Sequence, residues 1–208
     1  DSVVISGNSR ISEETIKIYG GIEIKKNYSE KDLNNILNKL NETEFFEDIK
    51  INLSKNFFSI DLKEYPVVNQ LIIVGEKSTK FKDQIKKLIE TKEKKSFINS
   101  KLSQDVERIK KLYSSIGHNG SKIETKIKTI DEKNLDLIIE VEKGAKSRIS
   151  NIIFIGDKKL KDRRLRDIIA SEEHKFWKVI SPNTNFREEL VKLDLRLLSN
   201  YYKSIGYY

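Results

Sequence analysis

The side chains that most often carry catalysis or bind metals are scarce in this chain, and their spacing forms no recognisable site. The chain has no cysteine, which excludes a disulfide framework, a thiol nucleophile and a thiolate metal site. Its two histidines, His118 and His174, are far apart, and neither has a second histidine at the spacing of a metal-binding pair. We therefore expect both histidines to lie in surface loops rather than to act as ligands or general bases.

Other sequence patterns of enzyme sites are missing as well. The glycine doublet Gly20-Gly21 is not followed by the lysine and serine or threonine of a phosphate-binding loop. No G-x-S-x-G segment marks a nucleophilic serine. The paired acids Glu13-Glu14 suit the start of a helix, and Glu172-Glu173 suit a solvated surface. We predict that the chain is not an enzyme and that it uses no cofactor and no metal.

The composition is that of a folded globular protein. Of the 208 residues, 37% are hydrophobic and 35% are charged, and the formal net charge is +8. No apolar run approaches the roughly 18 residues that a membrane-spanning helix needs. The basic excess lies after Pro66, and its densest patch, 157–167, interleaves acids with bases. Such interleaving favours a solvated helix face over a phosphate-binding patch.

The chain repeats one pattern three times. Each copy opens with a short apolar run that ends in glycine, at Gly7, Gly75 and Gly156. Runs of this kind are typical of buried strands. Apolar residues then recur at helical spacing, and these are Ile16 and Tyr19; Phe81, Ile85, Leu88 and Ile89; and Leu165, Ile168 and Ile169.

A second helix follows in each copy, and its register is the clearest of all. An aspartate precedes apolar residues at plus one, plus four and plus eight, namely Asp32 before Leu33, Ile36 and Leu40; Asp105 before Val106, Ile109 and Tyr113; and Asp194 before Leu195, Leu198 and Tyr202. We interpret the shared aspartate as structural, placed early in the helix where a carboxylate complements the helix dipole. Twelve residues later come Glu44, Gly117 and Gly206, where we expect the helix to end.

A strand pair with period-two alternation closes the first two copies. The segments are 49–53 with 58–62, and 123–127 with 135–141. The repeating unit is therefore β-α-α-β-β. We predict domains at 1–66, 67–146 and 147–208, the last with only its first strand, Ile152 to Gly156, and two helices, and we expect the native chain to continue.

Several of these segments resemble the POTRA domain family. They are the opening Ile5-Ser6-Gly7-Asn8, the step Phe45-Phe46-Glu47-Asp48-Ile49, the exit Leu62-x-Glu64-x-Pro66 and the helix end Tyr201-Tyr202 to Gly206-Tyr207-Tyr208. Glutamate at Glu44 and the pairs Gly75-Glu76 and Gly156-Asp157 depart from the family pattern. The resemblance implies an α+β fold of tandem units. Each would be a three-stranded mixed sheet, in the order first, third, second strand, backed by two antiparallel helices.

The resemblance also implies a function. POTRA arrays receive unfolded outer-membrane β-barrel proteins and accessory lipoproteins in the periplasm, beside a C-terminal membrane barrel of the same polypeptide. No nucleic acid takes part. The hairpin's first strand would then be the sheet edge that binds clients by strand addition, with the residues Lys122, Ile123, Glu124, Thr125, Lys126, Ile127 and Lys128. The lysines would discourage self-pairing, and Ile123 and Ile127 would offer apolar contacts.

A second candidate contact is the aromatic pair Phe176 and Trp177 in the long inter-helix loop of the third copy. Packing within the protein is the interpretation we favour for Trp177, with an apolar client-binding patch as the alternative.

Two other functions fit parts of the pattern. A KH-type nucleic-acid-binding module shares the β-α-α-β order, but it needs a G-x-x-G loop between its helices, and no copy has one. The POTRA region of a two-partner secretion transporter is the other alternative, and a division protein is a further one. Transporters of that class commonly have two units and division proteins one, so a third unit favours an assembly factor.

Overall fold

The computed structural model describes residues 3–23, 28–54, 57–156, 159–177 and 181–207. By internal packing the chain divides into two compact units. One comprises Asp1–Ile72, Glu90–Leu102 and Ile127–Ile138, and the other comprises Ile73–Ile89, Ser103–Lys126 and Ile139–Tyr208. This division passes through the second of the three sequence repeats, so domain boundaries at Pro66 and Lys146 remain a prediction.

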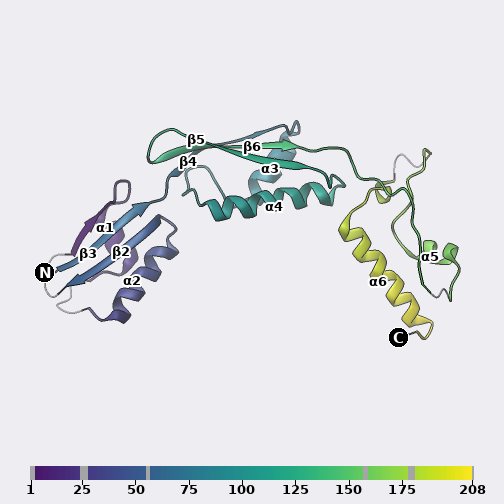
Figure 1. Cartoon of the computed structure of the whole chain (residues 1–208), viewed down its shortest axis with the longest axis horizontal. Helices are drawn as coiled ribbons and strands as arrows, with labels where there is room; N and C mark the ends of the chain where they lie inside the picture. Colours follow the sequence, from purple (N-terminus) through teal and green to yellow (C-terminus); the bar gives the residue numbers. More distant parts are fainter. Residues whose placement is uncertain (1–2, 24–27, 55–56, 157–158, 178–180, 208) are drawn as a thin grey trace. The chain divides into compact units, whose positions relative to one another are not determined.

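The first repeat folds as its pattern predicts. Its elements are β1 (Val3–Ser6), α1 (Glu13–Gly20), α2 (Glu30–Glu42), β2 (Phe46–Ser54) and β3 (Phe57–Glu64) (Figure 1). Strand β3 lies in the middle of the sheet, parallel to β1 and antiparallel to β2. The strand order first, third, second, which the family resemblance implied, is confirmed.

Among the described residues, the hydrophobic core of the first sheet consists of residues from its own repeat. The buried members are Ile5, Ile16, Ile36, Leu40, Phe46, Phe58, Ile60 and Leu62. Both helices begin at serine caps, because Ser12 Oγ accepts from Thr15 N–H and Ser29 Oγ accepts from Asp32 N–H. The helices of the first repeat are therefore stabilised by serine caps at their starts and by apolar burial against the sheet.

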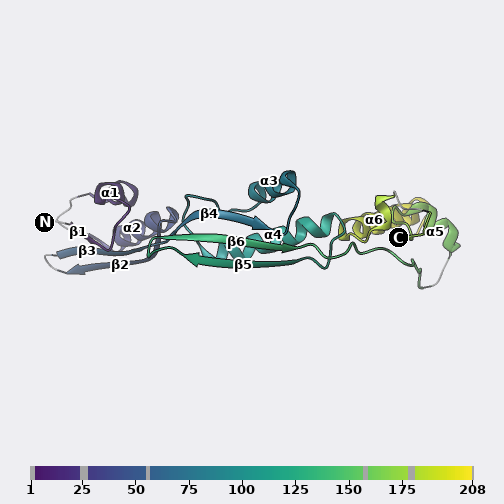
Figure 2. The ribbon, with the colours of Figure 1, turned by 90° about the horizontal axis from the view of Figure 1, so that it is seen from above.

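The second repeat has the same order of elements. They are β4 (Val67–Val74), α3 (Thr79–Leu88), α4 (Asn99–Ser115), β5 (Lys122–Thr129) and β6 (Asn134–Glu142). Figure 2 shows β6 between β4 and β5, in the order β4-β6-β5. Every second residue of β6 is buried, from Leu135 to Val141, because helices cover one face of the sheet.

The third repeat contains α5 (Asp162–Ile168), a short 3-10 turn η1 (Pro182–Thr184) and α6 (Glu188–Ser204). The predicted strand at Ile152–Gly156 is not a strand in the structure. Within the described residues no neighbouring strand lies beside this segment, and Ile153 and Ile155 are 69% and 94% exposed. A strand needs a hydrogen-bonding partner to form, so the apolar pattern alone was insufficient.

Three predicted stripe residues are wrong, because they lie outside the buried face of their helices. Tyr19, Leu88 and Leu195 are exposed, whereas Ile16, Ile85 and Leu165 are buried. In α6 the buried residues are Leu190 and Asp194. The neighbours of a helix decide how wide its buried face is, and spacing alone does not.

The shared aspartate is structural, but the helix-dipole interpretation is right only in the first repeat. There, Asp32 is the third helical residue and forms a capping box with Ser29. In α4 and α6 the helix begins six residues before the aspartate, and Asp105 is fully buried. Asp194 Oδ1 instead accepts the N–H groups of Ala170 (2.6 Å) and Ser171 (3.1 Å), which fixes the chain after α5.

The predicted helix ends are confirmed in all three repeats. Glu44, Gly117 and Gly206 have φ values of 57°, 93° and 89°, in the left-handed region. Glu44 adopts this conformation without being glycine, and its carboxylate pairs with Lys101. The helix end therefore depends on the position in the repeat more than on glycine itself.

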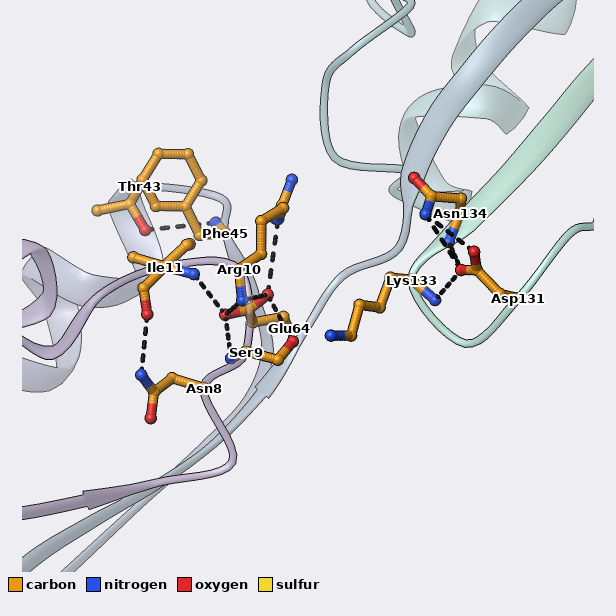
Figure 3. A network of polar contacts seen from close by, with 10 residues as sticks. All are labelled: Asn8, Ser9, Arg10, Ile11, Thr43, Phe45, Glu64, Asp131, Lys133 and Asn134. Carbon is orange, nitrogen blue, oxygen red and sulfur yellow. Dashed lines mark hydrogen bonds and ion pairs between the residues drawn. The ribbon is translucent and has the colours of Figure 1, made fainter.

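A carboxylate holds the loop that follows β1. Glu64 Oε1 accepts the N–H groups of Ser9 (2.9 Å), Arg10 (3.0 Å) and Ile11 (3.0 Å), as Figure 3 shows. The Arg10 guanidinium also pairs with Glu64 (3.5 Å). Burial raises the pKa of Glu64, but the hydrogen bonds from the loop and the nearby Arg10 outweigh burial, so the pKa lies below its ordinary value.

The second repeat uses a different carboxylate at the equivalent loop. Glu76, only 2% exposed, accepts from Ser78 N–H (2.8 Å), Tyr113 O–H (2.7 Å) and Lys143 Nζ (2.9 Å). Burial by itself raises the pKa of Glu76, but these three donors lower it to about 2. The network joins the loop after β4, helix α4 and the residue that follows β6.

The core of the second repeat should be sensitive to one buried position. Ile109 is fully buried in α4, so Ile109→Asp buries an unpaired charge and should cost about 3–5 kcal/mol of unfolding free energy. Because the first sheet has its own core, amide signals of residues 3–23 and 28–54 should stay dispersed in the NMR spectrum. Gln104→Asp, at an exposed position of the same helix, is the control. Loss of ordered signals throughout the first repeat would contradict independent folding.

The network around Glu76 should make stability depend on pH. The pKa of Glu76 falls from 4.5 to about 2 on folding, so its stabilisation is complete above pH 4.5 and is lost as the pH falls towards 2. The shift corresponds to about 3 kcal/mol. Glu76→Gln should therefore lower stability most at neutral pH, and its difference from wild type should shrink below pH 4.5 in urea melts. Glu132→Gln, an exposed glutamate of the β5–β6 turn, should show no such pH-dependent difference.

Candidate functional site

Strand β5 is the edge of the second sheet. In the described part of the chain its only neighbouring strand is β6, since the strand order is β4-β6-β5. It contains all seven residues that the sequence placed in a client-binding edge, Lys122 to Lys128. The position that the family resemblance implied is therefore the position observed, although client binding itself stays a prediction.

The register of the hairpin turns alternate backbone donors and acceptors of β5 away from β6. Ile130 N–H donates to Asn134 O (3.0 Å) at the end of the hairpin. In an antiparallel pair, hydrogen-bonded positions alternate, so the even-numbered residues of β5 bond to β6. The N–H and C=O groups of Ile123, Thr125 and Ile127 consequently point away from the sheet. Asp131 Oδ1 accepts the N–H groups of Lys133 (2.7 Å) and Asn134 (2.8 Å) and so holds the turn in shape (Figure 3).

The two isoleucines of β5 differ in accessibility. Ile123 is 9% exposed and packs into the core, so the expectation that it offers an apolar contact is wrong. Ile127 is 48% exposed and remains accessible. Both side chains lie on the helix-covered face, and helix cover reaches only the first of them. An apolar contact on β5 is thus restricted to the end of the strand near Ile127.

The three lysines of β5 lie on the opposite face, and two of them pair across the hairpin. Lys126 Nζ lies 2.7 Å from Glu140, and Lys122 Nζ lies 3.8 Å from Glu142. The hydrogen bond with Glu140, together with its charge, raises the pKa of Lys126 above the ordinary value. Both lysines stay largely exposed, so this face of the edge is charged and discourages pairing between copies of the chain.

Sequence reasoning missed an equivalent edge in the first repeat. Strand β2 pairs only with β3 in the described residues, in a register from Phe46 with Glu64 to Ser54 with Phe57. The signal was available, because β2 and β5 are the same strand of the repeating unit. The two edges differ in charge: β2 carries Glu47, Asp48 and Lys50, whereas β5 carries three lysines and one glutamate.

The aromatic pair of the third repeat is exposed rather than packed. Phe176 and Trp177 are 82% and 63% exposed, and their rings meet edge to face at 4.5 Å. Lys175 Nζ lies 5.6 Å from the centre of the Trp177 ring. The neighbouring Val179 and Ile180, which the sequence grouped with this pair, lie outside the described residues. The favoured packing of Trp177 is not seen, and the alternative of an apolar contact patch fits its exposure.

This aromatic pair lies in an insertion. In the second repeat, Lys94 N–H and Lys95 O bond to the backbone of Val68. In the third repeat the same two bonds to Ile149 come from His174 N–H and Thr184 O. Residues 175–183 therefore stand between positions that are adjacent in the second repeat. Exposed aromatic residues in an insertion, such as Phe176 and Trp177, are common in recognition.

The two histidines make local contacts with the backbone. His118 Nδ1 lies 3.1 Å from Gly144 O, and His174 uses its backbone N–H to bond Ile149 O (2.7 Å). Among the described residues, no cluster of histidine and acidic side chains could hold a metal ion. The same residues include no helix that is long and apolar enough to cross a bilayer.

Comparisons with known proteins match this chain to one family model and to proteins of one name. The POTRA family model, described as a surface antigen variable number repeat, matches residues 66–144 and 147–208. The outer membrane protein assembly factor BamA of Neorickettsia risticii is 24% identical over 98% of this chain, and that of Buchnera aphidicola is 30% identical over 86%. The chain spans only 28% and 30% of the length of these relatives.

Among solved structures, the chain is similar to POTRA domains 3–5 of BamA from Haemophilus influenzae. The identity is 15% and the TM-score is 0.46, with 96% of this chain and 84% of that chain covered.

The exposure of Trp177 can be measured directly, because it is the single tryptophan of the chain. Its fluorescence should be quenched readily by acrylamide, close to the rate for a free indole. Iodide should quench better than caesium, because Lys175 attracts the anion, and Lys175→Gln should reduce that preference. Protection from all three quenchers would show that Trp177 packs within the protein.

Proposed function

Because the chain belongs to the POTRA domain family, we propose that it is part of the periplasmic region of an outer-membrane β-barrel assembly factor. In this role it binds unfolded outer-membrane β-barrel proteins and accessory lipoproteins, and it adjoins a membrane barrel in the same polypeptide. The named relatives and the family match support this assignment.

The observation that carries the mechanism is the open edge of β5. An extended client strand can pair with the outward N–H and C=O groups of Ile123, Thr125 and Ile127. Main-chain hydrogen bonds of this kind do not read side chains, so one edge can serve clients of many sequences. In a client strand with alternating apolar and polar residues, the apolar side chains contact Ile127 on one face of the sheet. The polar side chains contact the lysines on the other face.

The exposed pair Phe176 and Trp177 supplies a second contact of a different kind. Large aromatic side chains are favoured anchors at protein interfaces because they bury much area at little entropic cost. Their position on an inserted loop makes them independent of either sheet edge. We assign this pair to an apolar segment of a client or of an accessory protein.

Proline at Thr125 tests strand addition. The N–H of Thr125 points outward, so Thr125→Pro removes a donor at the edge and leaves the bonds to β6 in place. An extended peptide of alternating valine and threonine, with blocked ends, should shift amide signals of residues 122–128 in the wild-type protein. The proline variant should bind at least about tenfold more weakly at this edge, while Thr125→Val, which keeps the N–H, should bind as wild type does.

Strand β2 provides the internal control in the same spectra. Shifts that the peptide causes at residues 46–53 should be the same in Thr125→Pro as in wild type, because that edge is unchanged. Equal binding at 122–128 by a folded proline variant, or shifts confined to residues 175–177, would contradict strand addition at β5.

A further inference from the structure

The opposite edge of the second sheet is not open. Residues 93–97 run along the outer side of β4: Val68 N–H donates to Lys95 O (3.0 Å), Lys94 N–H donates to Val68 O (2.7 Å) and Phe97 N–H donates to Pro66 O (2.7 Å). Further along β4, a side chain occupies the outer edge of the strand. Glu93 Oε1 accepts the N–H of Leu71 at 2.9 Å.

The same arrangement recurs in the third repeat. Ile149 N–H donates to Thr184 O (2.8 Å), His174 N–H donates to Ile149 O (2.7 Å) and Phe186 N–H donates to Ser147 O (2.8 Å). Three residues after Ile149, as Leu71 is three after Val68, Ile152 N–H donates to Glu173 Oε1 at 3.0 Å. The second and third repeats differ in sequence here, yet in both a glutamate carboxylate accepts the equivalent backbone N–H.

In the third repeat a cation completes the pair. Arg166 Nη2 donates to Ile152 O at 2.9 Å and lies 3.2 Å from Glu173 Oε1. The N–H and C=O of Ile152 are therefore both occupied, one by a carboxylate and the other by a guanidinium. A neighbouring strand would offer one acceptor and one donor at the same place.

We propose that Glu93 closes the outer edge of β4 against extended partner chains, and that Glu173 does the same for the equivalent segment of the third repeat, which is not a strand in the structure. An edge N–H that already donates to a carboxylate is no longer free to template a foreign strand. A partner strand that displaced the glutamate would also have to pack beside its carboxylate. Removing that charge from water costs free energy. The inference rests on the proposed strand addition and deepens it, because it leaves the hairpin edge as the accepting side.

The first readout is hydrogen exchange, which needs no partner. The Leu71 amide should exchange at least about tenfold faster in Glu93→Ala than in wild type, because its acceptor is gone. Glu93→Gln retains a side-chain carbonyl at the same place and should restore slow exchange. Asp83→Ala, an exposed acid on α3, is the matched control and should leave Leu71 unchanged. Glu173→Ala should have the corresponding effect on the Ile152 amide.

The second readout uses the blocked valine–threonine peptide. In wild type, peptide-induced shifts should appear at residues 122–128 and be absent from 67–74. In Glu93→Ala, new shifts should appear at 69–73, and in Glu93→Gln they should be absent. Shifts at 67–74 in wild type, an unchanged Leu71 exchange rate in Glu93→Ala, or no shifts at 69–73 in that variant while 122–128 still responds would each overturn the proposal.

The two proposals can fail separately. If the peptide leaves 122–128 unaffected in every variant, strand addition at β5 is wrong. Closure by Glu93 is then decided by the exchange rates of Leu71 alone.

Discussion

The contact on which each described sheet depends is that between a glycine and the backbone of the central strand. A Cβ atom on Gly7 would lie 1.9 Å from Leu62 O, and one on Gly75 would lie 2.0 Å from Val141 O. Both distances are impossible for a real side chain, and both glycines have φ near +80°. The chain that leaves the first strand therefore crosses the end of the third strand so closely that only glycine fits at the crossing.

The crossing exposes loop N–H groups that need an acceptor, and the two repeats meet this need differently. In the first, Glu64 at the end of β3 accepts three backbone N–H groups. In the second, the residue at the corresponding strand position is Lys143, and the carboxylate has moved into the loop as Glu76. The second repeat thus has glutamate after the glycine, where the family has asparagine, and lysine where the first repeat has Glu64. These two differences go together, because Glu76 pairs with Lys143. Buried acceptors are retained because unpaired N–H groups are costly, whichever residue supplies them.

The edges of the sheets differ in whether their backbone N–H and C=O groups are covered. The hairpin strands β2 and β5 leave one side without a neighbour in the described residues, whereas the outer side of β4 is covered by backbone and by Glu93. A sheet with two open edges can associate with itself and with clients without selection. In the proposed function, closing one edge gives the sheet a defined binding side, and the lysines of β5 discourage that side from pairing with another copy. The exposed Phe176 and Trp177 are the second proposed contact, of an apolar kind that no sheet edge provides.

The sequence by itself determined the repeat, the alternating hairpin strands and the helix ends, because these depend on local spacing and on one backbone conformation. It also placed the candidate edge correctly from Lys122 to Lys128, once the family's strand order was applied. Tertiary structure decided what spacing cannot express: that Ile123 is buried while Ile127 is exposed, that Leu195 faces away from the core, and that residues 152–156 form no strand. Periodicity fixes the face of an element on which a side chain lies, but only the neighbouring elements decide whether that face is covered. The roles of Asp194, Glu76 and Glu93 were hidden for the same reason, since each accepts N–H groups or pairs with side chains that only the folded chain brings close.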